Sequence, residues 1–240
     1  MCDTMRLTLK PLLGTLLRPM EAYLELRRQP RWFLAFALIA AASAACMALS
    51  MPFTRQVALA LLSGMLSTDE LGNAVSMSER IQDLAVFISP MGLLGKWLLA
   101  ATFLYLLSVI LDATEPHFGR IFATVVHAEI ILVVMAYVNV FLLYLKGPEA
   151  MHGPTDLQAI PGLDVLLSDS SANIPLFTLL NGINPFSLWY VAVLSTGMSV
   201  MTGLRRFTSG IMVAALWLAG LGCQYGIAAI GNSLRAAVGG

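Results

Sequence analysis

Five stretches of this sequence are long, apolar and nearly free of charged residues, and they restrict what the chain can fold into. A helix that crosses the hydrocarbon core of a bilayer needs about 20 mostly apolar residues, and its backbone must form its hydrogen bonds within the helix. The stretches that meet this requirement cover residues 32–51, 88–111, 120–145, 186–204 and 207–233. We therefore predict an all-α polytopic membrane protein, a bundle of five transmembrane helices.

The composition excludes two other classes of protein. Hydrophobic residues make up 58% of the chain and charged residues 12%, against roughly 45–50% and about 25% in soluble globular proteins. Lys and Arg equal Asp and Glu at 14 each, so the chain lacks the basic excess on which nucleic-acid binding depends. We expect membrane lipids, and not nucleic acid, as partners.

The residues before the first span form a separate predicted segment. Leu12, Leu16, Met20 and Tyr23 recur at helical spacing, with a break or bend expected at Pro19. We predict a cytoplasmic amphipathic leader over residues 1–30, lying along the membrane interface, and a five-helix membrane domain over residues 31–240. The leader either docks a partner or simply anchors the first span.

The positions of Lys and Arg predict the orientation, because cytoplasmic flanks carry an excess of positive charge. Nine of the 14 cations fall on the N-terminal side of the five spans: Arg6, Lys10, Arg18, Arg27, Arg28, Arg31, Arg120, Arg205 and Arg206. The other five are Arg55, Arg80, Lys96, Lys146 and Arg235. The N-terminus is therefore predicted to be cytoplasmic and the C-terminus external. The connections over residues 52–83 and 146–185 then fall outside, with an apolar run at residues 57–65 expected to form a short interfacial or buried helix.

Four polar side chains within the spans form a candidate intramembrane site, because ionisable groups are costly at that depth. Glu129 lies nine residues after Arg120, near the predicted bilayer centre, and no cation is expected near it. We expect a neutral carboxyl group that either relays protons or substrate, or hydrogen-bonds two helices together. His127 points to another side of the same helix and is interpreted as a buried bundle histidine. Lys96, six residues after Pro90, is expected to reach outward or to contact Asn139.

Two further features suggest contacts with lipid and between helices. Arg205 and Arg206 occupy the short connection between the last two spans and are candidates for binding lipid phosphate, although they also act as topology signals. Ser195, Ser199 and Gly203 form a small-residue face that permits close helix packing, within the bundle or in a homo-oligomer.

No catalytic template is present in the sequence. It contains no glycine-rich phosphate loop, no Gly-x-Ser-x-Gly and no His-Glu-x-x-His. The three Cys and three His are not spaced as zinc ligands. We predict a protein that is not an enzyme and that has no cofactor and no metal site.

Several short segments carry a family pattern. They are residues 18–23 (RPMEAY) and 29–32 (QPRW) in the leader, residues 67–71 (STDEL) and Pro90 before the second span, residues 118–122 (FGRIF), and residues 179–189 (LLNGINPFSLW) with Gly197 beyond. In these segments the chain resembles the Yip-domain family, named for Ypt/Rab-interacting proteins, in its prokaryotic form. Asn184 stands where the family usually has Asp.

The resemblance implies five spans, an internal N-terminus and an external C-terminus, and it indicates a bacterial cytoplasmic (inner) membrane. Eukaryotic relatives work in vesicle trafficking with small GTPases, whereas prokaryotic relatives largely lack an assigned activity. We therefore expect a non-enzymatic membrane organiser or adaptor that binds a membrane or cytoplasmic protein or a second copy of itself. The alternative is a small transporter, channel or lipid-translocating protein that uses Glu129 in the bundle core.

Overall fold

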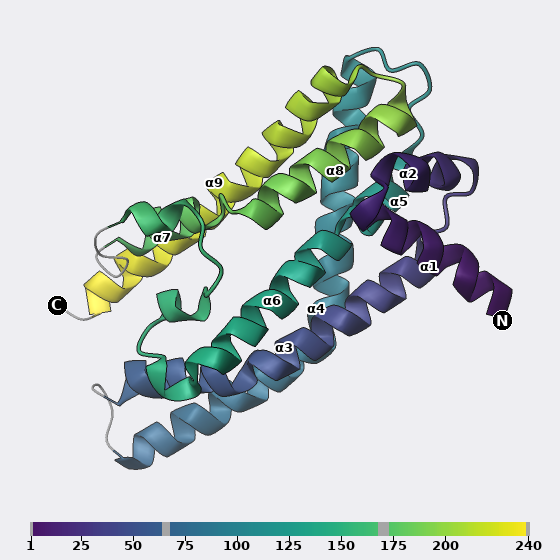
Figure 1. Ribbon diagram of the computed structural model, residues 1–240. Helices are drawn as coiled ribbons and strands as arrows, with labels where there is room; N and C mark the ends of the chain where they lie inside the picture. Colours follow the sequence, from purple (N-terminus) through teal and green to yellow (C-terminus); the bar gives the residue numbers. More distant parts are fainter. Residues whose placement is uncertain (1, 64–67, 168–172, 239–240) are drawn as a thin grey trace. The chain divides into compact units, whose positions relative to one another are not determined.

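The computed structural model describes residues 2–63, 68–167 and 173–238, and every regular element in these residues is a helix. The α-helices are α1 (Cys2–Leu17), α2 (Pro19–Arg28), α3 (Phe33–Leu62), α4 (Thr68–Ile110), α5 (Phe118–Ala128), α6 (Ile130–Lys146), α7 (Ile174–Asn181), α8 (Pro185–Thr202) and α9 (Arg206–Val238) (Figure 1). Three 3-10 helices, η1 (Pro148–Ala150), η2 (Pro154–Leu157) and η3 (Leu163–Leu166), lie between α6 and α7. The predicted all-α class is confirmed.

The described helices include enough long, apolar segments for a polytopic membrane protein. Four are long and apolar enough to cross a bilayer: Phe33–Leu62, Gly72–Ile110, Phe118–Lys146 and Arg206–Ser233. The α7 and α8 helices pass the same test when they are taken together as one broken span, which gives five. These segments coincide with the five stretches identified from charge and hydropathy.

Two helices are longer than the sequence suggested. The α3 helix continues through Pro52 to Leu62, so the described part of the apolar run at residues 57–65 belongs to this helix and does not form a short helix of its own. The α4 helix begins at Thr68 and continues through Pro90, although the second span was expected to begin at residue 88. A proline removes one backbone hydrogen bond, and transmembrane helices tolerate this loss where neighbouring groups compensate for it.

The chain divides into two compact units, and most long helices contribute to both. Unit 1 comprises Met1–Ala42, Pro90–Val134 and Pro185–Gly220, and unit 2 comprises Ser43–Ser89, Met135–Asn184 and Leu221–Gly240. The boundaries fall inside α3, α4, α6 and α9 and between α7 and α8.

The centre of unit 1 is α5. Residues 121–129 are all buried, so this segment is enclosed on every side, as expected of a helix that is apolar around its whole circumference. The main core cluster joins α5 to α4 through Trp97, Ala101 and Leu104, and to α8 through Leu194 and Met198. Trp32 packs its ring edge-on against Phe122 at 5.1 Å between centroids and so ties the start of the first span to α5.

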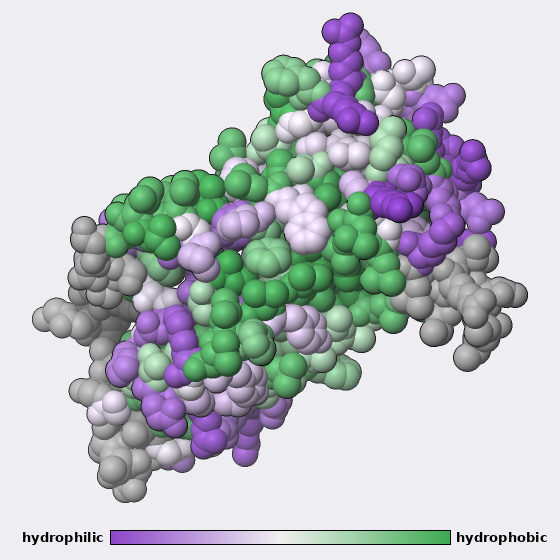
Figure 2. All heavy atoms as spheres, in the orientation of Figure 1, coloured by the Kyte–Doolittle hydropathy of each residue, from purple (hydrophilic) through white to green (hydrophobic). Residues whose placement is uncertain are grey.

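The leader is docked on this core. The α2 helix packs on α5 and α8, and α1 packs on α2 and α5 (Figure 1). Tyr23 and Leu26 of α2 and Leu12 of α1 are buried, whereas Met20, which was expected on the apolar side, is largely exposed. The predicted break falls at Arg18, just before Pro19. In Figure 2 the hydrophilic side chains of unit 1 gather over α2 and the α4–α5 and α8–α9 connections.

Unit 2 has a smaller core of its own. Phe53 and Val57 of α3 pack with Leu143 of α6 and Met151, which lies just after η1. Two carboxylates of the predicted acidic connection bind its backbone: Asp156 accepts the N–H groups of His152 and Gly153, both at 2.9 Å, and Asp164 accepts the Gly162 N–H at 2.7 Å. Asp169 of the same connection, and Ser67 of the segment 67–71, lie outside the described residues.

Candidate functional site

The centre of the candidate site is an ion pair within the membrane-spanning part of unit 1. The Lys96 Nζ of α4 donates to Glu129 Oε1, at 2.5 Å. The Glu129 side chain is 5% exposed and the Lys96 side chain 50% exposed. A carboxylate that is almost enclosed by protein is therefore compensated by a cation whose own side chain reaches the surface of the unit.

This pairing corrects the expectation that no cation lies near Glu129. Lys96 was expected near the outer end of its span because it lies six residues after Pro90, but α4 does not begin at Pro90. Measured from the other ends of the two helices, Ile110 of α4 and Phe118 of α5, Lys96 and Glu129 lie about 21 Å and about 17 Å along at 1.5 Å per residue. A long and flexible lysine side chain closes the remaining difference.

Glu129 also marks the one-residue interruption between α5 and α6. Its backbone has φ −59° and ψ −21°, and its N–H donates to Val125 O at 3.2 Å. Its carbonyl accepts the Val133 N–H at 3.0 Å. Helical hydrogen bonds therefore continue on both sides of Glu129, and Phe118–Lys146 acts as a single span.

The second carboxylate oxygen of Glu129 is also buried. Among the described residues, Oε2 has no hydrogen-bond partner. Lys96 therefore satisfies one oxygen of the carboxylate, and the other is enclosed without a partner among the described residues.

His127 is separate from this pair. Its side chain is fully buried, and Nδ1 lies 2.8 Å from the Ala123 carbonyl oxygen one turn earlier. Among the described residues, Nε2 has no hydrogen-bond partner, and no hydrogen bond joins His127 to Glu129. The two residues therefore do not form one hydrogen-bonded group in this structure, which agrees with their opposite directions on the helix.

Asn139 has a different set of partners from the one expected. Its Nδ2 donates to Leu157 O at 2.9 Å, and its Oδ1 accepts the N–H groups of Ala159 at 2.7 Å and Ile160 at 3.2 Å. All of these residues belong to unit 2. Asn139 therefore fastens the connection between η2 and η3 to α6, and the partner of Lys96 is Glu129 instead.

Arg205 and Arg206 lie at the tight connection between α8 and α9. The chain turns at Gly203, whose φ of +72° lies in the left-handed region that favours glycine. The Arg206 guanidinium lies 3.7 Å from Met20 Sδ of the leader. Neither arginine forms an ion pair with any described residue.

A tight contact between the leader and α8 was not recognised from the sequence. A Cβ atom on Gly197 would lie 2.5 Å from Thr124 Cγ2 of α5 and 2.8 Å from Tyr23 Cζ of α2. The Tyr23 side chain is fully buried, and this burial raises the pKa of Tyr23, so its hydroxyl group stays neutral. Tyr23 and Gly197 both occur in the family segments, but their distance in the chain gave no signal that they touch.

The residues that the structure describes contain no group of three or more His, Cys, Asp or Glu side chains that could hold a metal ion.

In comparisons with known proteins, the family model described as "Yip1 domain" matches residues 13–227. No curated protein and no solved structure matches the chain.

Proposed function

This chain belongs to the Yip1-domain family, and from that premise we propose that it is a non-enzymatic organiser or adaptor of its membrane. It is an integral membrane protein of a family that is not catalytic. The family indicates the class of protein, and we infer that the docked leader is the part of the molecule that binds a partner. We infer that the leader presents a surface to a membrane or cytoplasmic protein, or to a second copy of the chain.

The observation that carries this proposal is the two-sided character of the leader. One side of α1 and α2 is buried against α5 and α8 through Tyr23, Leu26 and Leu12. The other side exposes two apolar pairs at helical i, i+4 spacing, Leu13 with Leu17 on α1 and Met20 with Leu24 on α2. A leader that served only as an anchor would have no need for a rigidly docked inner face.

The distribution of charge between the units supports a cytoplasmic leader. Unit 1 contains ten of the Lys and Arg residues and six of the Asp and Glu residues, and unit 2 contains four and eight. All nine cations on the N-terminal side of the spans belong to unit 1, and its tenth, Lys96, is neutralised by Glu129. Under the positive-inside rule, we place the loops of unit 1 in the cytoplasm, the C-terminus outside and the protein in a bacterial cytoplasmic membrane.

Site-specific photo-crosslinking tests the adaptor proposal. A photoreactive residue at Leu17, which is 86% exposed, should produce a discrete protein adduct in native membranes. A matched probe at Leu218 of α9, also an exposed leucine of unit 1, should give lipid adducts only. If neither position captures a protein or a second copy of the chain, the adaptor proposal fails.

The Lys96–Glu129 pair favours a second candidate, a small transporter, channel or lipid-translocating protein. Ionisable groups inside a membrane often mark the path of an ion or a proton. Glu129 Oε2 and His127 Nε2 are both buried and lack hydrogen-bond partners among the described residues. A proton that moved between a buried carboxylate and a half-exposed lysine would have a route toward the surface of unit 1.

A flux measurement tests this second candidate. If the protein transports protons or a substrate coupled to them, Glu129→Gln should abolish pH-dependent flux into proteoliposomes. Glu115→Gln is the matched control, because the Glu115 side chain is 74% exposed and lies in the α4–α5 connection. Flux that is equal in the wild type and in Glu129→Gln would remove Glu129 from any transport mechanism.

A further inference from the structure

A hollow lies between α1, α2 and the turn that leads into α3. It encloses about 190 Å³ and is lined by Pro11 of α1, by Glu25, Leu26 and Arg28 of α2, and by Gln29 and Arg31 of the turn that follows. This volume equals that of roughly six water molecules at about 30 Å³ each. It has room for a phosphate group and its nearest atoms, and it is smaller than the usual site of a drug-sized ligand.

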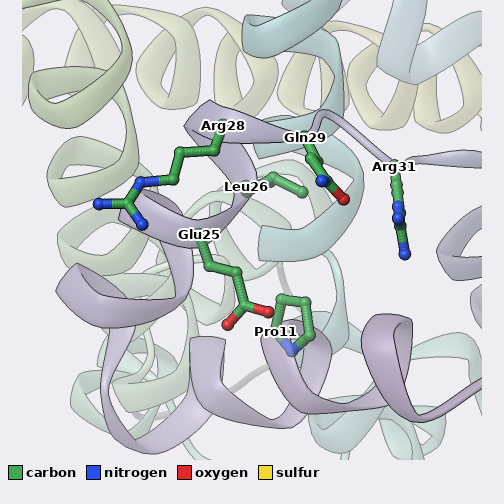
Figure 3. Close-up of a pocket in the computed structure, with 6 residues that line it drawn as sticks. All are labelled: Pro11, Glu25, Leu26, Arg28, Gln29 and Arg31. Atoms are coloured by element: carbon green, nitrogen blue, oxygen red, sulfur yellow. The ribbon is translucent and has the colours of Figure 1, made fainter. Parts of the chain in front are cut away.

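The walls of the hollow combine an apolar floor with a positively charged rim. Leu26 and Pro11 are buried. Figure 3 shows Gln29 and Arg31 extending toward the side where Pro11 lies, whereas the Arg28 guanidinium extends to the opposite side, away from Arg31. The one carboxylate, Glu25, already has a cation near it, since Lys10 Nζ lies 3.6 Å from Glu25 Oε2.

The two arginines carry charge that no described residue neutralises. Neither Arg28 nor Arg31 forms an ion pair with any described residue. A guanidinium group binds phosphate oxygens through two parallel hydrogen bonds, which makes arginine well suited to phosphate recognition. The Gln29 amide adds a neutral donor beside Arg31.

The position of the hollow in the chain indicates the source of the phosphate. Arg31 stands two residues before α3, the first membrane span, and Trp32 between them packs against Phe36 and Phe122. Tryptophan is enriched at the level of lipid headgroups. A phosphate bound to Arg31 would therefore lie at the height of a phospholipid headgroup, above an apolar floor.

We propose that the hollow between α1 and α2 binds the phosphate of an acidic phospholipid through Arg31, with the positive charge of Arg28 at its edge. The lipid would fasten the leader to the bilayer surface while leaving Leu13, Leu17, Met20 and Leu24 available to a partner. This inference deepens the adaptor role and depends on the leader lying at the membrane surface.

Native mass spectrometry of the purified full chain in detergent tests the proposal. The number of bound lipids is measured as phosphatidylglycerol or phosphatidylcholine with the same acyl chains is added. The wild type should retain one phosphatidylglycerol in preference to phosphatidylcholine. Arg28→Gln with Arg31→Gln should weaken this binding roughly tenfold, because the contact of Arg31 with the phosphate and the nearby positive charge of Arg28 are both lost.

A control variant distinguishes a specific lipid site from a general electrostatic attraction of acidic lipids to the basic leader. Arg18→Gln with Arg27→Gln removes the same charge from the same leader but touches no residue that lines the hollow, so phosphatidylglycerol retention should stay within about twofold of the wild type. Equal losses in the two double variants, or no preference for phosphatidylglycerol, would overturn the proposal.

Two further measurements identify the ligand and test the lipid site separately from the adaptor role. Millimolar inorganic phosphate should not displace the retained lipid, and full displacement would assign the hollow to a soluble phosphate. The crosslink from Leu17 is measured in parallel. If the Arg28→Gln/Arg31→Gln variant loses lipid retention but keeps the crosslink, the lipid site is confirmed independently of the partner. If the wild type retains the lipid but gives no crosslink, only the adaptor role is contradicted.

Discussion

Lys96→Met should lower the free energy of unfolding by about 3 kcal/mol, the largest effect that we expect from a single substitution in this chain. The substitution keeps the length and apolar stem of the side chain but leaves the Glu129 carboxylate, which is 5% exposed, without its cation. Removing one partner of a buried pair is costly because the remaining charge has no compensation. We place the effect at the lower end of the usual range because the Lys96 side chain is 50% exposed.

Thermal and denaturant unfolding of the purified protein in micelles measures this loss. Arg55→Met is the matched control: its pair with Glu79 is 3.0 Å long, and both side chains are about half exposed. Exposed pairs contribute little, so this variant should lose less than about 1 kcal/mol. The combined variant Lys96→Met with Glu129→Leu should recover most of the stability, because an apolar pair replaces an ionic one. Equal losses for Lys96→Met and Arg55→Met would show that Glu129 does not depend on Lys96.

Gly197→Ala should have the second largest effect, a loss of about 1–3 kcal/mol through overpacking. The new methyl group would lie 2.5 Å from Thr124 Cγ2 and 2.8 Å from the Tyr23 ring, so α2, α5 and α8 cannot all keep their positions. Because Tyr23 is fully buried, it has no free space into which it can move. We therefore expect α2 to loosen from α8, which limited proteolysis of the leader would detect together with the loss of stability.

Two companion variants decide whether the contact is the cause. Gly210→Ala in α9 adds the same methyl group where no atom lies within 4 Å, and it should be neutral or stabilising by up to about 1 kcal/mol through helix propensity. Thr124→Ser removes the Cγ2 methyl group and should restore part of the stability lost by Gly197→Ala. Similar stability changes in Gly197→Ala and Gly210→Ala would contradict the close approach seen in the structure.

The helices and the membrane class could be predicted from the sequence because both depend on the average properties of short stretches of residues. Hydropathy over about 20 residues decides whether a segment is apolar enough to span a bilayer. The five predicted stretches match four long helices and the α7–α8 pair. The break at Pro19 could be predicted in the same way. Helix ends were less certain, as α3 and α4 show by continuing through Pro52 and Pro90.

The candidate site could be predicted only in part. The sequence identified Glu129, Lys96 and Asn139 as polar groups in apolar surroundings, which is a property of each residue and its neighbours. It assigned their partners wrongly, because the partner of a side chain depends on where two helices begin and how each is rotated. An error of several residues at the start of one helix shifts the estimated depth by about 1.5 Å per residue. The hollow beside Arg31 likewise requires Pro11 and Leu26 to meet, and no pattern in the chain predicts that contact.

By itself, therefore, the sequence determined the membrane class of this protein, its helices and the concentration of cations toward one side of its spans. Each of these follows from how many residues of a kind occur in a given stretch. Only the tertiary structure decided that Lys96 neutralises Glu129, that Tyr23 packs against Gly197 and that two arginines of the leader border a hollow. These contacts join residues 15 to more than 170 positions apart, and their formation depends on how the helices pack together.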